Sequence, residues 1–478
     1  MNPLIISRSE HSLSRKWISP NALRVLYRLK EGGYFAYLVG GGVRDLLLGR
    51  EPKDFDIATN ATPGEVKKLF RNCRLIGRRF RLAHIYFHND IVEVATFRSS
   101  TPEGPEAEAK VEVKVKARVS EPGLLREGGS VPAGHTAPEA PMRPRPPRML
   151  KTEGGMILRD NVFGTSEEDA LRRDFTVNAL FYNIADFSVI DYVGGMRDLR
   201  QGLIRIIGDP DVRFVEDPVR MVRAVRFAAL LGFGIEENTY RALIELRDNV
   251  ALASPARLYE ETLKLFLKGE AGKTYDLLKK TGMFGVLFPR VNEWLDTETE
   301  GFPHIRIGKA LEWVDAGIQA GRQVSSSLLF ALMLGQYIEE KAAEFGAAGV
   351  SPVAALEQAV AAFLGEETHR VQIPKKVGLA MRDILWNQRR FERTGGKHPL
   401  YFSKRPGFEE AFDYLRFQCE LTGEKTDLLE WWKAFIKKHP PARAEAEEGQ
   451  KRERPPLKAP KRRRRRRKGA SEMQKPKA

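Results

Sequence analysis

The sequence predicts an α/β domain, then an all-α body and a disordered basic tail. Short apolar runs bounded by polar residues, typical of strands, occur in the first part of the 478-residue chain. From Asp209 onward, apolar residues recur three or four positions apart, as in amphipathic helices. The last 28 residues contain fourteen Lys or Arg against two Glu and almost nothing that could enter a core.

Changes in composition suggest the domain boundaries. We expect an α/β head at residues 20–200, a helical neck at 201–270, a helical body at 271–440 and a tail at 441–478. Within the head, residues 101–148 are rich in Pro, Glu and Gly, so we expect a flexible loop insertion there. Its VEVKVKARV alternates well enough for a short hairpin.

Individual elements follow from the same patterns. Strands are expected at 34–39 (YFAYLV), 55–58 (FDIA) and 90–98 (DIVEVATFR), and a helix at 62–72. In the later part, helical spacing covers 217–233, 255–269 and 273–288. The head therefore alternates strands and helices, whereas the rest is helical.

The net charge of +16 is concentrated in the tail, which carries +12. Residues 461–468 read KRRRRRRK and lie among prolines, so we expect a disordered polycation. A solubility tail or a targeting signal would explain this charge, but we favour the binding of a polyanion such as RNA.

Other features exclude several protein classes. Cys73 and Cys419 are too few for a disulfide framework, and the histidines lack metal-ligand spacing. The longest apolar run, 328–334, is far shorter than the roughly 20 residues that a bilayer requires. The first residues lack a signal-peptide core. We therefore expect a cytoplasmic protein with no integral membrane span, and a monomer.

A glycine turn follows the first expected strand. Gly40 and Gly41 would allow backbone N–H groups to come close to a ligand, and the helix after them would offer its N-terminal end to an anion. Arg44 adds a cation. Most such turns merely connect a strand to a helix, so the turn alone is weak support for a site.

Two carboxylates follow this turn. If 54–57 is a strand, Asp54 and Asp56 lie on one face while Phe55 and Ile57 enter the core. Adjacent negative charges with no nearby cation in the sequence indicate a bound metal. An EF-hand loop is the rival, but its downstream Gly and terminal Glu are missing. Mg²⁺ holding a nucleoside triphosphate fits better.

Glu93 is a candidate third carboxylate. Val92 and Val94 would point to the opposite face, so a neighbouring strand could bring Glu93 beside the aspartates. Two Mg²⁺ ions shared by three carboxylates would activate an attacking hydroxyl and stabilise a leaving pyrophosphate. The alternative is an exposed strand residue.

Four motifs resemble, in order, those of the class II nucleotidyltransferases, the family of tRNA CCA-adding enzymes and bacterial poly(A) polymerases. They are VGGGVRDLLLG with DFDIAT (39–59), LRRDFTVNALFYN (171–183), DYVGGMRDL (191–199) and EDPVRMVRAVRFAA (216–229). The resemblance covers 37–229 apart from 101–148, and more loosely the chain to about Trp432.

This resemblance implies a polymerase β-like nucleotidyltransferase head with a mixed sheet, and a helical neck and body that bind nucleotide and RNA. It also implies two Mg²⁺ ions held by the three carboxylates, ATP as substrate, and untemplated addition of AMP to RNA 3′ ends. Residues 75–87 (LIGRRFRLAHIYF) and the basic tail are similar to the poly(A) polymerase branch.

The resemblance assigns further residues to the nucleotide. It implies that Arg172, Arg173, Asp174 and Asn178 contact sugar and phosphates; the alternative is an ion-pair cluster at a helix start. The glycine turn with Arg44 would also face the nucleotide.

Asp217 and Arg220 are three residues apart, so on a helix they would share a face. An accepting carboxylate beside a donating guanidinium complements the base edge of adenine, and equally that of cytosine. The pair therefore explains rejection of G and U but not a choice between A and C.

Arg220, Arg223 and Arg226 form a stripe on the same helix. A solvated face is the default interpretation of such spacing, with a phosphate or base role best supported for Arg220.

Three functions stay open: a poly(A) polymerase, a CCA-adding tRNA nucleotidyltransferase, and a non-catalytic RNA-binding protein. The intact set of carboxylates argues against the third, while the first two share the core chemistry.

Overall fold

The computed structural model describes residues 2–77, 81–88, 90–99, 150–151, 157–159, 163–297, 302–365 and 370–440. The chain divides into two compact units, 1–382 and 383–478. The expected insertion at 101–148 and tail at 441–478 lie outside the described residues, so both stay predictions, as do the expected domain boundaries. Across the described ranges, no helix has the length and apolarity needed to cross a membrane.

The first unit contains a mixed eight-stranded sheet. Its order is β1-β10-β9-β2-β3-β6-β5-β4. The strands are β1 (Leu4–Ile6), β2 (Ala36–Val39), β3 (Asp56–Thr59), β4 (Cys73–Ile76), β5 (Leu82–Phe87), β6 (Asp90–Thr96), β9 (Leu180–Asn183) and β10 (Val189–Asp191). The three strands predicted at 34–39, 55–58 and 90–98 are confirmed as β2, β3 and β6.

The centre of this sheet places the acidic segment beside the glycine turn. β2 runs antiparallel to β3, with Val39 opposite Asp56. β3 runs parallel to β6, with Ile57 opposite Val94. A parallel pair needs a crossover, which here contains α3 (Pro63–Leu69) and the β4–β5 hairpin. Thr62 and Glu65 form a capping box that starts α3, the helix predicted at 62–72.

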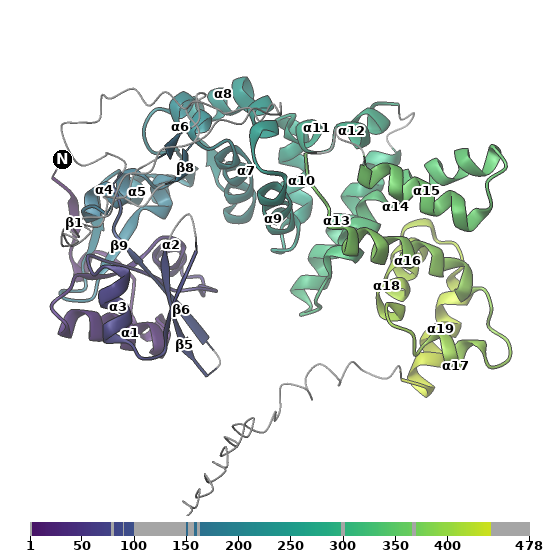
Figure 1. Cartoon of the computed structure of the whole chain (residues 1–478), viewed down its shortest axis with the longest axis horizontal. Helices are drawn as coiled ribbons and strands as arrows, with labels where there is room; N and C mark the ends of the chain where they lie inside the picture. The colour runs from purple at the N-terminus through teal and green to yellow at the C-terminus, as the bar shows by residue number, and fades with distance from the viewer. Residues whose placement is uncertain are drawn as a thin grey trace, which may run out of the picture. The chain divides into compact units, whose positions relative to one another are not determined.

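Helices complete the head. α1 (Pro20–Glu31) and α3 pack against each other and against the sheet, and Val25, Leu26 and Leu29 of α1 are fully buried (Figure 1). α2 (Gly41–Leu47) packs on β2 and β9. The other short elements are α4 (Ser166–Leu171), η3 (Thr176–Asn178) and α5 (Gly195–Gln201), with the two-residue and three-residue strands β7 (Leu150–Lys151), β8 (Ile157–Arg159), β11 (Leu203–Ile204) and β12 (Gly234–Ile235).

The rest of the first unit is helical, as predicted (Figure 1). The expected segment 273–288 is divided by Gly282, whose φ of 70° ends one helix and starts the next. The helices are α6 (Pro210–Glu216), α7 (Val219–Leu231), α8 (Glu237–Leu246), α9 (Pro255–Phe266), α10 (Ala271–Lys280), α11 (Met283–Leu287), α12 (Pro289–Asp296), α13 (Phe302–Gln319), α14 (Ser326–Ala347) and α15 (Pro352–Gly365).

The second unit is built around a small aromatic core. Its helices are the end of α16 (Lys375–Phe391), α17 (His398–Phe402), α18 (Phe408–Thr422) and α19 (Thr426–Lys438). Trp432 is fully buried and its indole Nε1 donates to the Phe391 carbonyl oxygen at 2.9 Å. Apolar burial around this indole holds the last described helix in place.

Candidate active site

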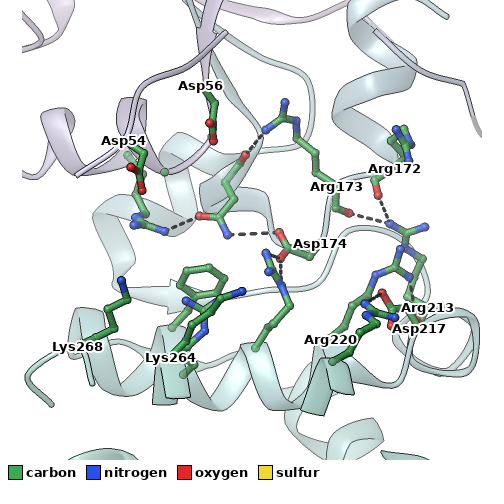
Figure 2. Close-up of a pocket in the computed structure, with 18 residues that line it drawn as sticks. Asp54, Asp56, Arg172, Arg173, Asp174, Arg213, Asp217, Arg220, Lys264 and Lys268 are labelled. Carbon is green, nitrogen blue, oxygen red and sulfur yellow. Dashed lines mark hydrogen bonds and ion pairs between the residues drawn. The ribbon is translucent and has the colours of Figure 1, made fainter. Parts of the chain in front are cut away.

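A cavity of about 640 Å³ lies in the first unit and is lined by ten Lys or Arg and four Asp side chains (Figure 2). Its volume is in the range of small-molecule sites. Every predicted site residue except Glu93 lines it, namely Gly40, Gly41, Arg44, Asp54, Asp56, Arg172, Arg173, Asp174, Asn178, Asp217 and Arg220. The excess of cations makes the cavity suited to a polyanionic ligand.

The glycine turn forms part of the cavity wall. Gly40 has a φ of 72° and stands between β2 and α2. A Cβ atom on Gly40 would lie 3.1 Å from Arg173 Nη1, so glycine is needed both for the backbone conformation and for the approach of this guanidinium.

The aspartates enter the cavity from the head (Figure 2). Asp56 is the first residue of β3, whereas Asp54 precedes the strand. The expectation that strand alternation directs both side chains is therefore wrong for Asp54, because the strand begins two residues later. Both residues nevertheless line the cavity. Among the described residues, neither carboxylate has a hydrogen-bond or ion-pair partner.

Glu93 lies on β6, next to Asp56 on β3, because Ile57 and Val94 are paired. Its side chain is 46% exposed and does not line the cavity; Oε1 lies 3.1 Å from His84 Nε2. The sequence thus placed Glu93 beside Asp56 correctly but gave no sign of the His84 contact.

Charge accumulates on Asp56. Desolvation in the cavity, the negative charge of Glu93 and that of Asp54 raise its pKa to about 6, against the lowering effect of Arg173. Uncompensated carboxylates of this kind fit a divalent cation, and Mg²⁺ prefers oxygen ligands. Within the described part of the chain, no three acidic, His or Cys side chains already converge closely enough to hold an ion.

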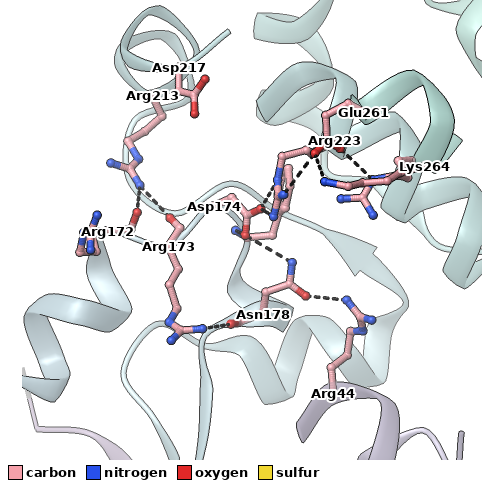
Figure 3. Close-up of polar contacts among 12 residues, drawn as sticks. Arg44, Arg172, Arg173, Asp174, Asn178, Arg213, Asp217, Arg223, Glu261 and Lys264 are labelled. Carbon is pink, nitrogen blue, oxygen red and sulfur yellow. Dashed lines mark hydrogen bonds and ion pairs between the residues drawn. The ribbon is translucent and has the colours of Figure 1, made fainter. Parts of the chain in front are cut away.

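A polar network centred on Asn178 forms the floor of the cavity (Figure 3). Arg44 Nη1 donates to Asn178 Oδ1 at 2.6 Å, and Asn178 Nδ2 donates to Asp174 Oδ1 at 3.3 Å. Arg223 binds Asp174 Oδ2 through Nε at 2.7 Å and through Nη2. Burial alone would raise the pKa of Asp174, but Arg223 and the other donors lower it to about 2. The sequence alternative of a helix-start cluster is wrong, since Asp174 follows the end of α4.

The two arginines before Asp174 are fixed from different sides. Arg173 is bonded through Nη2 to Asp169 Oδ2 at 3.0 Å and through Nη1 to the Asn178 carbonyl oxygen at 3.2 Å. Arg213 Nη2 donates to the carbonyl oxygens of Arg172 and Arg173, both at 2.7 Å. Burial and the neighbouring Arg220 lower the pKa of Arg213 to about 10.

Asp217 and Arg220 both line the cavity, but they do not share a helix. Asp217 has an extended backbone and caps the end of α6, and α7 begins at Val219. Pro218 disfavours helical geometry at the residue before it, which explains the break. Asp217 Oδ2 accepts from Arg257 Nη2 at 2.9 Å, and Arg220 Nη1 lies 3.3 Å from Glu216 Oε2.

The arginine stripe of α7 is not a solvated face. Arg220 and Arg226 are each only 9% exposed. Arg226 Nε lies 3.3 Å from Glu261 Oε2 on α9, and its guanidinium lies over the Phe227 ring at 4.4 Å. The helical spacing of the stripe was visible in the sequence; its acidic partner on another helix was not.

Other lining residues were not singled out from the sequence: Arg213, Phe227, Arg257, Lys264 and Lys268. Figure 2 shows Lys264 and Lys268 on the side of the cavity opposite Asp54 and Asp56. Spacing of four residues could have linked the two lysines, but nothing in the sequence indicates that α9 faces the head.

Comparison with known proteins agrees with this geometry. The model of the poly A polymerase head domain matches residues 36–205, and those of a probable RNA and SrmB-binding site of polymerase A and of the polymerase A arginine-rich C-terminus match 232–295 and 348–469. Poly(A) polymerase I of Salmonella typhi is 42% identical over 91% of this chain and 86% of its own. The chain belongs to the poly(A) polymerase family of class II nucleotidyltransferases.

Members of the sister branch match less of the chain. The CCA-adding enzyme of Leuconostoc mesenteroides is 33% identical over 57% of this chain and 56% of its own. The crystal structure of the Bacillus stearothermophilus CCA-adding enzyme in complex with CTP has a TM-score of 0.56 and 24% identity, covering 88% of this chain and 83% of that one. This likeness establishes that poly(A) polymerase family members such as this chain share the fold of CCA-adding enzymes.

Proposed function

We propose that this protein transfers AMP from ATP to RNA 3′ ends without a template and releases pyrophosphate. One observation carries the proposal: a single cavity combines the aspartate pair with an excess of six cations over carboxylates among its lining residues. The relatives named poly(A) polymerase I align over nine-tenths of the chain, which supports this activity over CCA addition.

Each part of the cavity has a role in this reaction. Asp54, Asp56 and Glu93 would hold two Mg²⁺ ions, which when bound favour ionisation of the attacking hydroxyl and neutralise charge on the leaving pyrophosphate. Arg44, Arg172 and Arg173, with the Asn178 network behind them, would hold the sugar and the triphosphate. Their guanidinium groups are pre-positioned by the contacts described above, which reduces the reorganisation needed on binding.

Asp217 and Arg220 would read the base edge. A carboxylate can accept several hydrogen bonds, so Asp217 can bind the adenine amino group while Arg257 holds its Oδ2. Arg220 uses Nη1 for the Arg213 carbonyl oxygen and for Glu216, and its other N–H groups can donate to adenine N1. Cytosine presents the same order, so the choice of A over C depends on the size and rigidity of the pocket.

Two other functions are weaker candidates. A CCA-adding enzyme would use the same residues, and its relatives match a little over half of the chain. A non-catalytic RNA-binding protein would have no need of Asp54 and Asp56 without protein partners. We propose a cytoplasmic monomer; the two cysteines are free and buried, as in a reducing compartment.

An AMP-transfer assay tests the proposal. We expect the wild-type protein to extend a single-stranded RNA primer with ATP and Mg²⁺. Asp56→Asn removes ligand charge without changing shape and should slow the reaction roughly 10² to 10³-fold, equivalent to about 3 to 4 kcal/mol. The control, Asp90→Asn, makes the same change outside the cavity, where Asp90 binds Asn21, and should keep normal turnover. Near-normal turnover of Asp56→Asn at saturating Mg²⁺ would contradict the proposal.

A further inference from the structure

Three neighbouring strands bring one ionisable side chain each into a row. The β3–β6 register sets Asp56 beside Glu93, and the β5–β6 register sets His84 directly opposite Glu93. Val92 and Val94 are each 2% exposed and point to the other face of the sheet. Glu93 therefore stands between the carboxylate that lines the cavity and an imidazole that lies outside it.

The imidazole makes a defined contact with Glu93. His84 Nε2 lies 3.1 Å from Glu93 Oε1. Because a carboxylate only accepts, the proton in this contact is on Nε2. The His84 side chain is 17% exposed, compared with 46% for Glu93, and the neighbouring Ala83 and Ile85 are buried. The more fixed partner is thus the histidine, and the more mobile one is the carboxylate.

The other neighbours of His84 are engaged elsewhere. Arg74 on β4 is paired with His84 in the sheet register, but its guanidinium lies over the Tyr86 ring at 5.3 Å. The Tyr86 ring centroid is 6.3 Å from that of His84. In the described part of the head, Glu93 is the acidic partner of His84.

We propose that His84 is a positioning residue for Glu93. By holding Oε1 it keeps the carboxylate in the row and leaves Oε2 for a cation on the Asp56 side. His84 does not touch the substrate; it acts through Glu93. Groups that hold metal-ligating side chains in place contribute about 10 to 100-fold to metal affinity. The inference rests on the proposed function, because it presupposes that Glu93 is a metal ligand.

Direct metal binding tests this role independently of catalysis. Mn²⁺ is titrated into the metal-free full-length protein, and free Mn²⁺ is measured by electron paramagnetic resonance. His84→Ala should weaken Mn²⁺ binding about 10 to 100-fold. His84→Gln, whose amide can donate at a similar reach, should recover most of that loss. His88→Ala removes an exposed histidine from the same hairpin and should match the wild type.

A second readout separates positioning from general damage to the fold. In His84→Ala, the Mg²⁺ concentration for half-maximal AMP addition should rise, while kcat at saturating Mg²⁺ should be close to that of the wild type. Thermal unfolding without metal should be similar for His84→Ala and His84→Gln.

Three results would overturn the role. They are unchanged Mn²⁺ binding in His84→Ala, tighter binding in that variant, and equal losses in the Ala and Gln variants. Asp56→Asn serves as the reference that removes the site. A wild-type protein that binds Mn²⁺ through Asp56 but adds no AMP would defeat the proposed function alone, since the role of His84 would still be decided by the binding data.

Discussion

Asp174 connects the nucleotide cavity to the stability of the fold. Because Arg223 and backbone donors hold its pKa at about 2, below the ordinary value of 3.8, the folded state binds this proton less readily than the unfolded chain does. The resulting stabilisation is fully present above pH 4 and is lost as the pH falls from 4 towards 2. A shift of this size corresponds to about 2 kcal/mol of the free energy of unfolding.

We therefore expect Asp174→Asn to lower the free energy of unfolding by about 2 kcal/mol at pH 7. The difference from the wild type should shrink as the pH is lowered from 4 to 3. Urea denaturation of both proteins at pH 7, 4 and 3 measures this. A difference that does not change with pH would mean that packing, rather than ionisation, explains the role of Asp174.

The residues that sequence reasoning found are those that lie in short ordered motifs. Asp54, Asp56 and Arg173 were identified because their spacing and residue types already indicate phosphate and metal chemistry. Arg257 and Lys268 were missed because they reach the cavity only through the packing of α9, and no local pattern encodes that. Asp217 was assigned to a helix because the effect of Pro218 on the preceding residue was not considered.

At the scale of elements, the contact between α5 and η3 determines where Asn178 stands. A Cβ atom on Gly195, the first residue of α5, would lie 2.3 Å from the Thr176 carbonyl oxygen. Thr176 begins η3, and its hydroxyl donates to Asp198 of α5 at 2.8 Å. Since backbone cannot yield as a flexible side chain can, any larger residue must push the two elements apart.

We expect Gly195→Ala to destabilise the protein by about 1 to 3 kcal/mol and to weaken ATP binding by displacing Asn178. Gly64→Ala is the matched control, because Gly64 lies near the start of α3 with open space around it and no positive φ. That change should be neutral or stabilising by up to about 1 kcal/mol. Thermal unfolding and ATP titration measure both effects. Equal stability of the two variants would contradict the close contact.

Strands and helices with clear periodicity were predicted well, and the assembly of the sheet was not. β2, β3 and β6 follow from alternation in the sequence. β9 pairs with β2 although some 140 residues separate them in the chain, and β1 and β10 have three residues each, too few for a periodic signal. The divided helix at Gly282 requires a positive φ, which the apolar spacing on both sides concealed.

At the scale of the whole molecule, charge is separated from chemistry. Residues 451–478 carry +12, whereas 102–148 carry +1. If the tail binds RNA phosphates, truncation after Gln450 should weaken RNA binding and flatten its salt dependence. Each lost phosphate contact should remove about 0.7 from the log-log slope for a single strand.

Deletion of 102–148, replaced by a short Gly/Ser linker, is the control for the truncated tail. It should leave the salt slope and AMP addition to short primers unchanged, since this segment has almost no net charge. Fluorescence anisotropy with labelled RNA at several salt concentrations compares the two deletions. An unchanged slope after tail truncation would reassign the tail to solubility or targeting.

The central claim is tested most directly by supplying ATP or CTP, separately and together, with two RNA primers. One primer is a generic single strand and the other is a tRNA lacking its CCA end. We expect long A tails on the generic primer with ATP and little addition from CTP alone, because adenine fills space in the pocket that cytosine would leave empty. Efficient repair of the tRNA, with termination after the final A and no growth on generic RNA, would contradict the proposal and identify a CCA-adding enzyme.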